Sequence, residues 1–326
     1  MAKIAVAGGG AWGTALAQTA ARAGNSVIWW MRDAEQANDI RRTRENRRRM
    51  PGLTLAHQIE IAATIQDLEA VDCTLAAVPA QALRELCGIL PAGTSPLVIC
   101  AKGLEQATGM RLSEVARARA PGRGVAVLSG PAFAAEVALE KPAAVTLAAE
   151  RLEDAAHIGR LLKTPAFRLY PSDDLAGVEI AGAMKNVIAI AAGICMGKRL
   201  GENARAALIT RGLAEIGRLA AAIGGRPTTL LGLAGLGDLM LTATSLTSRN
   251  TRLGYELATG GDHHSLLGPA HALAEGAWTA GAAMALAAKL KVDLPITDAV
   301  NRIVKNEVTV ERAIEELLER PAPSRE

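Results

Sequence analysis

The chain has 326 residues, which is long enough for two domains that each bury a hydrophobic core. Half of the residues are hydrophobic but only 2% are aromatic, a composition that favours packed helices over an aromatic-rich β-sandwich. The formal net charge of +3 is small and argues against a surface dedicated to nucleic acid, although local basic pockets for a phosphorylated ligand stay compatible with it.

The cysteines, at positions 73, 87, 100 and 195, are widely spaced and form no CxxC pair. This spacing indicates a reduced compartment without a zinc site, so we expect no metal. The N-terminus lacks the pattern of a signal peptide, and glycine, proline or charge interrupts the apolar runs before they reach the length of a membrane span. We therefore expect a cytoplasmic protein without membrane insertion.

An apolar run at residues 3–7 stands directly before Gly8, Gly10 and Gly13, and an alanine-rich helical segment at residues 15–23 follows. In dinucleotide-binding units the first glycine permits the tight turn, the second lets the backbone approach a pyrophosphate, and the third lets helix pack on strand. The helix N-terminus then faces the anion. The glycine spacing alone is weak evidence. Here, however, a strand precedes it and a helix follows it, as a dinucleotide-binding unit requires, so the segment predicts a Rossmann-type site.

Residues 26–31 are typical of a second strand, and Arg32 and Asp33 follow it at the place where the adenosine ribose would lie. A guanidinium there suits a ribose 2′-phosphate, whereas a carboxylate suits a free 2′-hydroxyl. We favour NADP, or use of both NADP and NAD, because Arg32 comes first after the strand. The alternative is a charged surface turn.

Further strands are predicted at residues 73–78, 96–100, 125–128 and 143–148, with helical segments between them. This alternation indicates a parallel sheet wound on both sides. After about Pro171 the strand signals stop, and long segments rich in alanine, leucine and glycine follow. We expect an α/β Rossmann-type dinucleotide-binding domain at residues 1–172 and an all-α domain for substrate binding and catalysis at residues 173–326.

Two other patterns invite functional interpretations. Residues 41–49 are dense in arginine but contain no aromatic side chains, so a solvated helix face is favoured over an RNA-binding arm. His263 and His264 lie in a polar stretch without a spaced carboxylate or thiolate, and we assign them to a loop.

Lys185 lies in an apolar stretch, residues 178–193, that only three polar residues interrupt. One interpretation is a lysine whose stem crosses a helix face while its head reaches solvent. The other is an enclosed lysine that donates and accepts protons near neutral pH, because an unpaired ammonium is costly to bury. The dinucleotide motif favours the second interpretation.

Asp238 follows a glycine-rich turn, so we expect it near a helix start, where a mere capping role is the alternative. Ser248, Arg249 and Asn250 supply in sequence a hydroxyl, a planar cation and an amide. This triplet suits a phosphate monoester.

With these segments the chain resembles the bacterial NAD(P)-dependent sn-glycerol-3-phosphate dehydrogenase family over essentially its whole length. The segments that carry the resemblance are residues 8–17, 101–105, 128–137, 179–193, 203–215 and 231–250. The resemblance implies reversible reduction of dihydroxyacetone phosphate to sn-glycerol 3-phosphate, which supplies phospholipid synthesis, and it makes a homodimer reasonable. It also implies that Lys185 is the acid and base, that Asp238 holds and polarises it, and that Lys102 supplies a second cation.

The resemblance assigns the remaining site residues. Arg249 and Asn250 match the phosphate-binding residues, and Ser248 and the backbone of Gly130 complete the substrate pocket. Asn186 and Thr242 are implied supporting partners. Positions that contact the dinucleotide in the family are, besides the glycines, Ala11, Trp12, Arg32, Asp33, Lys102, Ala134, Arg249, Leu273 and Glu275.

The chain departs from the family pattern at two positions. Ala11 replaces a serine common in the family but keeps the backbone amide, and Ala132 replaces a serine or threonine and so removes one hydroxyl from the substrate site. Two rival functions stay open: a related dehydrogenase acting on a β-hydroxy acid or sugar acid, and a non-catalytic NADP-binding sensor whose helical domain only dimerises.

Overall fold

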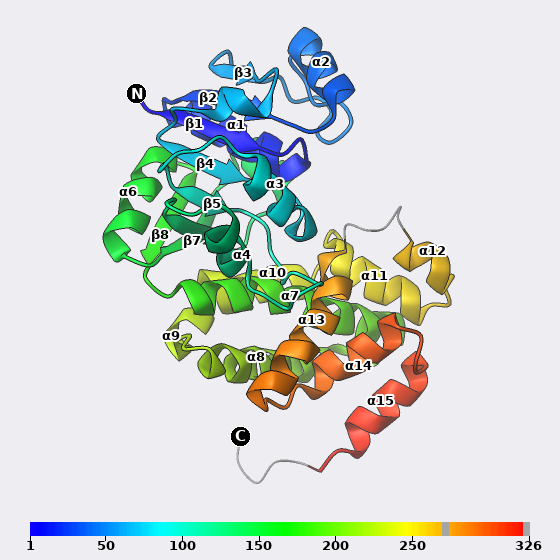
Figure 1. Ribbon diagram of the computed structural model, residues 1–326. Helices are drawn as coiled ribbons and strands as arrows, with labels where there is room; N and C mark the ends of the chain where they lie inside the picture. The colour runs from blue at the N-terminus through cyan, green and yellow to red at the C-terminus, as the bar shows by residue number, and fades with distance from the viewer. Residues whose placement is uncertain (269–273, 322–326) are drawn as a thin grey trace. The chain divides into compact units, whose positions relative to one another are not determined.

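The computed structural model describes residues 1–268 and 274–321, which fall into two compact units. Unit 1 comprises Met1–Lys102 and Met110–Glu179, and unit 2 comprises Gly103–Gly109 and Ile180–Glu326. Unit 1 contains the β-sheet, whereas the described part of unit 2 is helical (Figure 1).

Unit 1 is built on an eight-stranded sheet with the order β3-β2-β1-β4-β5-β6-β7-β8. The strands β1 to β6 are mutually parallel, and their order 3-2-1-4-5-6 is that of the Rossmann fold, so the expected fold class is confirmed. The strands are β1 (Lys3–Ala7), β2 (Ser26–Trp30), β3 (Ile59–Ile61), β4 (Cys73–Ala76), β5 (Leu97–Ile99), β6 (Val125–Ser129), β7 (Ala143–Ala149) and β8 (Phe167–Ser172).

The expectation of a fully parallel sheet is wrong at one step, because β7 pairs with β6 antiparallel. The segment that joins them contains only the short helix α5 (Ala134–Ala138), whereas a parallel crossover usually carries a full helix across the sheet. The pairing of β7 with β8 is parallel again, and the connection between them carries the eleven-residue helix α6 (Leu152–Leu162).

The helices of unit 1 pack in two groups: α1 against α5 and α6, and α3 against α4. The face that α1 buries consists largely of glycine, alanine and threonine, small residues that let the helix approach the sheet closely. Besides α5 and α6, the helices are α1 (Ala11–Arg22), α2 (Ala34–Thr43), η1 (Ile65–Leu68), η2 (Ala80–Ala82), α3 (Leu83–Ile89) and α4 (Leu112–Arg119).

Unit 2 is organised around α7 (Leu175–Gly197), which begins in unit 1 and becomes the centre of a separate core. The other elements are α8 (Glu202–Ala222), α9 (Pro227–Leu230), η3 (Leu233–Gly237), α10 (Asp238–Ala243), α11 (Arg249–Ala258), α12 (His263–Leu267), α13 (Glu275–Leu290), α14 (Pro295–Val304) and α15 (Val310–Glu319). The histidine pair therefore begins a short helix, not a loop, because Asp262 caps it by accepting a bond from the Ser265 N–H.

Two glycines bring α7 and α11 into backbone contact. A Cβ atom at Gly193 would lie 1.9 Å from the Thr251 carbonyl oxygen, and one at Gly254 would lie 1.9 Å from the Ile190 carbonyl oxygen. Any larger side chain would separate the two helices. This close approach sets the distance between the helix that carries Lys185 and the helix that begins at Arg249.

The expectation that every apolar run is interrupted before it reaches the length of a membrane span is wrong for α7. This helix is long and apolar enough to cross a bilayer, with a mean hydropathy of 1.6 in its most apolar window. However, 89% of its most apolar window is buried inside the protein. The helix is therefore a core helix of a soluble fold.

Candidate active site

Lys185 is buried on α7 with two oxygen partners from α10. Its Nζ atom donates to Oδ1 of Asp238 at 2.6 Å and to Oγ1 of Thr242 at 2.7 Å. Thr242 in turn donates to the main-chain oxygen of Asp238 at 2.6 Å, one turn earlier on the same helix. The lysine is 7% exposed and the aspartate 1%, so its head does not simply reach solvent from an apolar face.

The local fold aims Asp238 at the lysine. The segment before it, η3, is a π-helical turn, where a Cβ atom at Gly235 would lie 2.1 Å from the Leu230 carbonyl oxygen. Asp238 begins α10, as predicted, but Gly237 is the capping residue. The aspartate side chain instead accepts a bond from Lys185, which argues against a mere capping role. Turns of the π type are frequent at functional sites.

The Ser248–Arg249–Asn250 triplet forms the start of α11, close to this pair. Ser248 caps the helix by accepting a bond from the Thr251 N–H at 3.3 Å, and Thr251 Oγ1 donates to the main-chain oxygen of Thr242 at 2.6 Å. Asn250 accepts a bond from the Gly276 N–H at 3.0 Å, while Arg249 is exposed. A ten-residue helix that begins with a cation and an amide offers an anion both donors and the positive end of its dipole.

In unit 1, Lys102 and Gly130 follow the carboxyl ends of the neighbouring strands β5 and β6. The Nζ atom of Lys102 donates to the main-chain oxygen of Gly130 at 3.0 Å. The structure thus brings together two of the predicted site residues at the strand edge where ligands of open α/β sheets bind.

The glycine turn after β1 has the geometry of a pyrophosphate site. Gly8 has a φ of +129°, and a Cβ atom there would lie 2.3 Å from the Ala77 carbonyl oxygen. A Cβ atom at Gly13 would lie 2.0 Å from the Gly8 carbonyl oxygen, whereas one at Gly10 would meet nothing within 4 Å. Gly10 therefore leaves open the side from which a phosphate approaches the first turn of α1, so the turn fits NAD(P).

Three side chains, whose roles the sequence does not indicate, bind the carbonyl oxygens of this turn. The Trp29 indole donates to the Gly8 carbonyl oxygen at 2.8 Å, and the Gln36 and Asn46 amides donate to the Gly9 carbonyl oxygen at 2.8 and 3.1 Å. All three side chains are buried. They orient the turn by its carbonyl groups, which leaves the helix N–H groups for an anion.

The two candidate ribose residues differ in their surroundings. Arg32 is exposed, and its nearest carboxylate, on Glu85, lies 3.6 Å away. Asp33 caps α2 by accepting a bond from the Gln36 N–H at 3.0 Å and also accepts one from Arg48 at 2.7 Å. The bond from the Gln36 N–H, followed by the Arg48 charge, lowers the pKa of Asp33 below its ordinary value.

Comparisons with known proteins agree with this geometry. The model of the NAD-dependent glycerol-3-phosphate dehydrogenase N-terminus matches residues 3–155, and that of the C-terminus matches residues 174–315. The chain belongs to this family. Glycerol-3-phosphate dehydrogenase [NAD(P)+] from Rhodospirillum rubrum is 50% identical over 98% of this chain and 92% of its own, and that from Bradyrhizobium diazoefficiens is 48% identical over 99% and 98%.

A solved glycerol-3-phosphate dehydrogenase has the same fold throughout. The crystal structure from Coxiella burnetii superposes with a TM-score of 0.92 at 37% identity and covers 98% of this chain and 99% of its own. The family resemblance, the fold class and the use of NAD(P) are thereby confirmed.

The structure places most of the remaining residues that the glycerol-3-phosphate dehydrogenase resemblance assigns. Ala11 and Trp12 open α1, Ala134 opens α5 and Glu275 opens α13. Asn186 is buried on α7, and Ala132 is half-buried before α5. Leu273 lies outside the described residues.

The sequence does not indicate the roles of two buried carboxylates, because the partners of each lie far away along the chain. Glu179 accepts bonds from the N–H and hydroxyl of Ser113, and Glu215 accepts the N–H groups of Ile296 and Thr297 at the start of α14. Burial raises the pKa of both carboxyls, and these hydrogen bonds lower it in part. Both carboxylates hold helix N-termini in place.

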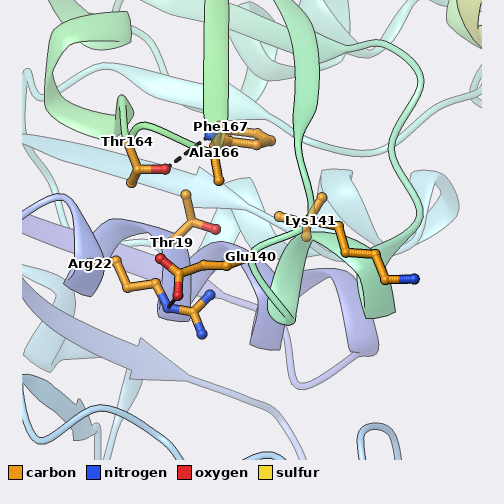
Figure 2. Close-up of a pocket in the computed structure, with 8 residues that line it drawn as sticks. Thr19, Arg22, Glu140, Lys141, Thr164, Ala166 and Phe167 are labelled. Carbon is orange, nitrogen blue, oxygen red and sulfur yellow. Dashed lines mark hydrogen bonds and ion pairs between the residues drawn. The ribbon is translucent and has the colours of Figure 1, made fainter.

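A small hollow in unit 1 lies between the end of α1, the segment that follows α5 and the start of β8 (Figure 2). Arg22 faces Glu140 there, with Nε 3.6 Å from the carboxylate, beside Thr164 and Lys141. The space holds about one water molecule and is too small for a dinucleotide or a triose phosphate.

Within residues 1–268 and 274–321 no group of His, Cys, Asp or Glu side chains is placed to hold a metal ion.

Proposed function

We propose that this chain catalyses the reversible reduction of dihydroxyacetone phosphate to sn-glycerol 3-phosphate with NAD(P)H, and that Lys185 is its acid and base. The observation that carries the proposal is the enclosed Lys185–Asp238 pair, joined through Thr242 and Thr251 to the start of α11. A proton donor and an anion-binding helix terminus thus lie in one rigid framework, as a keto phosphate requires.

Lys185 moves the proton. In the reducing direction its ammonium donates a proton to the oxygen that develops on C2, and in the oxidising direction the neutral amine takes the hydroxyl proton. Asp238 and Thr242 accept hydrogen bonds from the ammonium and so fix its position and direction. Lys102 supplies a second cation to the carbonyl end of the substrate, and its bond to Gly130 sets its position.

The start of α11 binds the phosphate. Arg249 offers a planar fork of N–H donors, Asn250 still has its amide NH₂ group to donate, and Ser248 can donate its hydroxyl hydrogen. The substrate-binding residues that the family resemblance assigns are Lys102, Gly130, Lys185, Asp238, Ser248, Arg249 and Asn250.

The turn from Gly8 to Gly13 and the first turn of α1 bind the pyrophosphate of the cofactor, and Arg32 or Asp33 reads the adenosine ribose. When bound, the nicotinamide supplies the hydride for C2. The other cofactor-binding positions are Ala11, Trp12, Lys102, Ala134, Arg249, Leu273 and Glu275.

The wider setting follows from the family. We assign dinucleotide binding to residues 1–172 and substrate binding and catalysis to residues 173–326. The family resemblance further implies that the protein is a cytoplasmic homodimer and that its product supplies glycerophospholipid synthesis.

A direct assay separates this function from its rivals. NADH or NADPH oxidation is followed by absorbance with dihydroxyacetone phosphate, and in parallel with short β-keto acids. We expect turnover of the keto phosphate alone. Preferred turnover of the β-keto acids would make the chain a different dehydrogenase, and absence of turnover with all substrates would favour the sensor.

A further inference from the structure

The arginine-rich segment that follows α2 is anchored to the dinucleotide turn. The Asn46 side chain donates to the Gly9 carbonyl oxygen at 3.1 Å and to Thr14 Oγ1 at 2.9 Å, and it accepts a bond from the Gln36 amide at 3.0 Å. Asn46 is 1% exposed. The loop therefore leaves from a fixed point beside the predicted pyrophosphate site.

The backbone after Asn46 is also fixed. The N–H groups of Arg49 and Met50 donate to the Asn46 carbonyl oxygen at 3.1 and 2.7 Å, and the Gly52 N–H donates to the Glu45 carboxylate at 2.6 Å. Arg48 sits within this closed turn. Its side chain thus projects from a rigid base, although the guanidinium itself is about half exposed.

Arg48 reaches back to the end of β2. Its Nη1 atom donates to Oδ2 of Asp33 at 2.7 Å, and its Nη2 atom lies 3.7 Å from the Glu35 carboxylate. The other oxygen of Asp33 already accepts the Gln36 N–H. Both oxygens of the Asp33 carboxylate therefore accept hydrogen bonds, and the positive charge of Arg48 compensates its negative charge.

We propose that Arg48 is a specificity-determining residue that neutralises Asp33 and thereby admits a ribose 2′-phosphate, so that the site accepts NADPH. A carboxylate at the end of the second strand ordinarily holds a free 2′-hydroxyl and repels a phosphate. With Arg48 bound to it, Asp33 loses most of that repulsion, and the exposed Arg32, which directly precedes Asp33 in the chain, supplies a second cation to the phosphate. The inference rests on the proposed NAD(P) site at the glycine turn.

Fragments of the cofactor test this without catalysis. Binding of adenosine 2′,5′-bisphosphate and of 5′-AMP to the full chain is measured by calorimetry for the parent and for Arg48→Met, which keeps the apolar stem of the side chain. We expect the bisphosphate to bind about tenfold to a hundredfold more weakly and 5′-AMP to change by less than about twofold. Arg47→Met, in the same loop but paired with Glu45, is the matched control and changes neither ligand.

The double variant Asp33→Asn/Arg48→Met tests the mechanism of the effect. Asparagine keeps the cap of α2 but carries no charge, so bisphosphate binding recovers most of the way to the parent value if Arg48 acts through Asp33. A double variant as weak as Arg48→Met, or equal losses for both ligands in Arg48→Met, would overturn the proposal. Failure of the parent chain to reduce dihydroxyacetone phosphate would instead overturn the proposed function, since fragment binding needs no substrate.

Discussion

The Nζ atom of Lys185 lies 2.6 Å from Oδ1 of Asp238, although 53 residues separate the two along the chain. Both side chains are buried. Removing one member of such a pair leaves an uncompensated buried charge and costs about 3–5 kcal/mol, so stability must be measured beside activity for every variant of the pair.

Replacing Asp238 by Asn slows the reaction. The amide still accepts a hydrogen bond from Lys185 but carries no charge, so the charge-assisted bond that holds the ammonium is weakened. We expect kcat for ketone reduction to fall by about tenfold or more while NADPH binding is unchanged. Asp154→Asn, at an exposed carboxylate of α6, is the control. Equal kcat values for Asp238→Asn and the parent would exclude an electrostatic role for Asp238.

Arg249→Ala weakens substrate binding more than it slows chemistry. A charge-assisted hydrogen bond to phosphate contributes about 1.5–3 kcal/mol, so we expect KM for dihydroxyacetone phosphate to rise by about one to two orders of magnitude. Arg252→Ala, on the same helix but bound to the Leu246 carbonyl oxygen, serves as the control. An unchanged KM in Arg249→Ala would remove the phosphate site from α11.

Two glycine variants separate binding from folding. At Gly10 a Cβ atom meets no protein atom within 4 Å, so Gly10→Ala keeps its stability within about 1 kcal/mol but binds NADPH at least about tenfold more weakly. At Gly13 a Cβ atom would lie 2.0 Å from the Gly8 carbonyl oxygen, so Gly13→Ala loses about 1–3 kcal/mol of unfolding free energy or more. Denaturant unfolding and NADPH fluorescence measure the two effects, and normal NADPH binding by Gly10→Ala would contradict this reading of the turn.

Glu215 gives the helical unit a pH-dependent stability. Burial raises the pKa of its carboxyl above the ordinary value of 4.5, although the N–H groups of Ile296 and Thr297 lower it in part. The folded chain thus holds this proton more tightly than the unfolded chain does. Glu215 therefore contributes most to the unfolding free energy when the pH is below the ordinary carboxyl pKa of 4.5. This contribution falls as the pH rises through the higher pKa of the folded state.

The variant Glu215→Gln isolates that contribution. The glutamine makes weaker hydrogen bonds to α14 at every pH and does not ionise. We therefore expect the difference in unfolding free energy between the parent and the variant to shrink as the pH rises from about 4.5. Urea denaturation at a series of pH values measures this. A constant difference between parent and variant would show that Glu215 has no raised pKa.

Patterns local in sequence predicted much of the fold. The strands β1, β2, β4, β5, β6 and β7 each follow from a run of apolar residues. β3 is the short segment Ile-Glu-Ile, in which a charged residue interrupts the apolar pair, and β8 contains Pro171, which an edge strand tolerates. The antiparallel step at β7 depends on how short the preceding connection is, a feature of the packed sheet that alternation of strands and helices does not encode.

The candidate site follows the same division. Lys185 and Asp238 stand out because each places a charge against an apolar or glycine-rich background, and the Ser248–Asn250 triplet stands out because it supplies a hydroxyl, a cation and an amide in sequence. Asn46 and Arg48 sit in a run of arginines that gives no sign of which side chain turns inward or reaches Asp33. Their roles depend on contacts across the fold, so they appear only in the structure.

Single-turnover reduction of dihydroxyacetone phosphate by Lys185→Met/Asp238→Asn tests the central claim most directly, since this double variant removes the proton donor without leaving a lone buried charge. Lys289→Met, at an exposed lysine of α13, is its control. We expect NADPH to bind as in the parent while the rate of hydride transfer falls by about 10²–10⁴-fold. A folded double variant that binds NADPH and reduces the ketone at the parent rate would contradict the assignment of Lys185 as the acid and base.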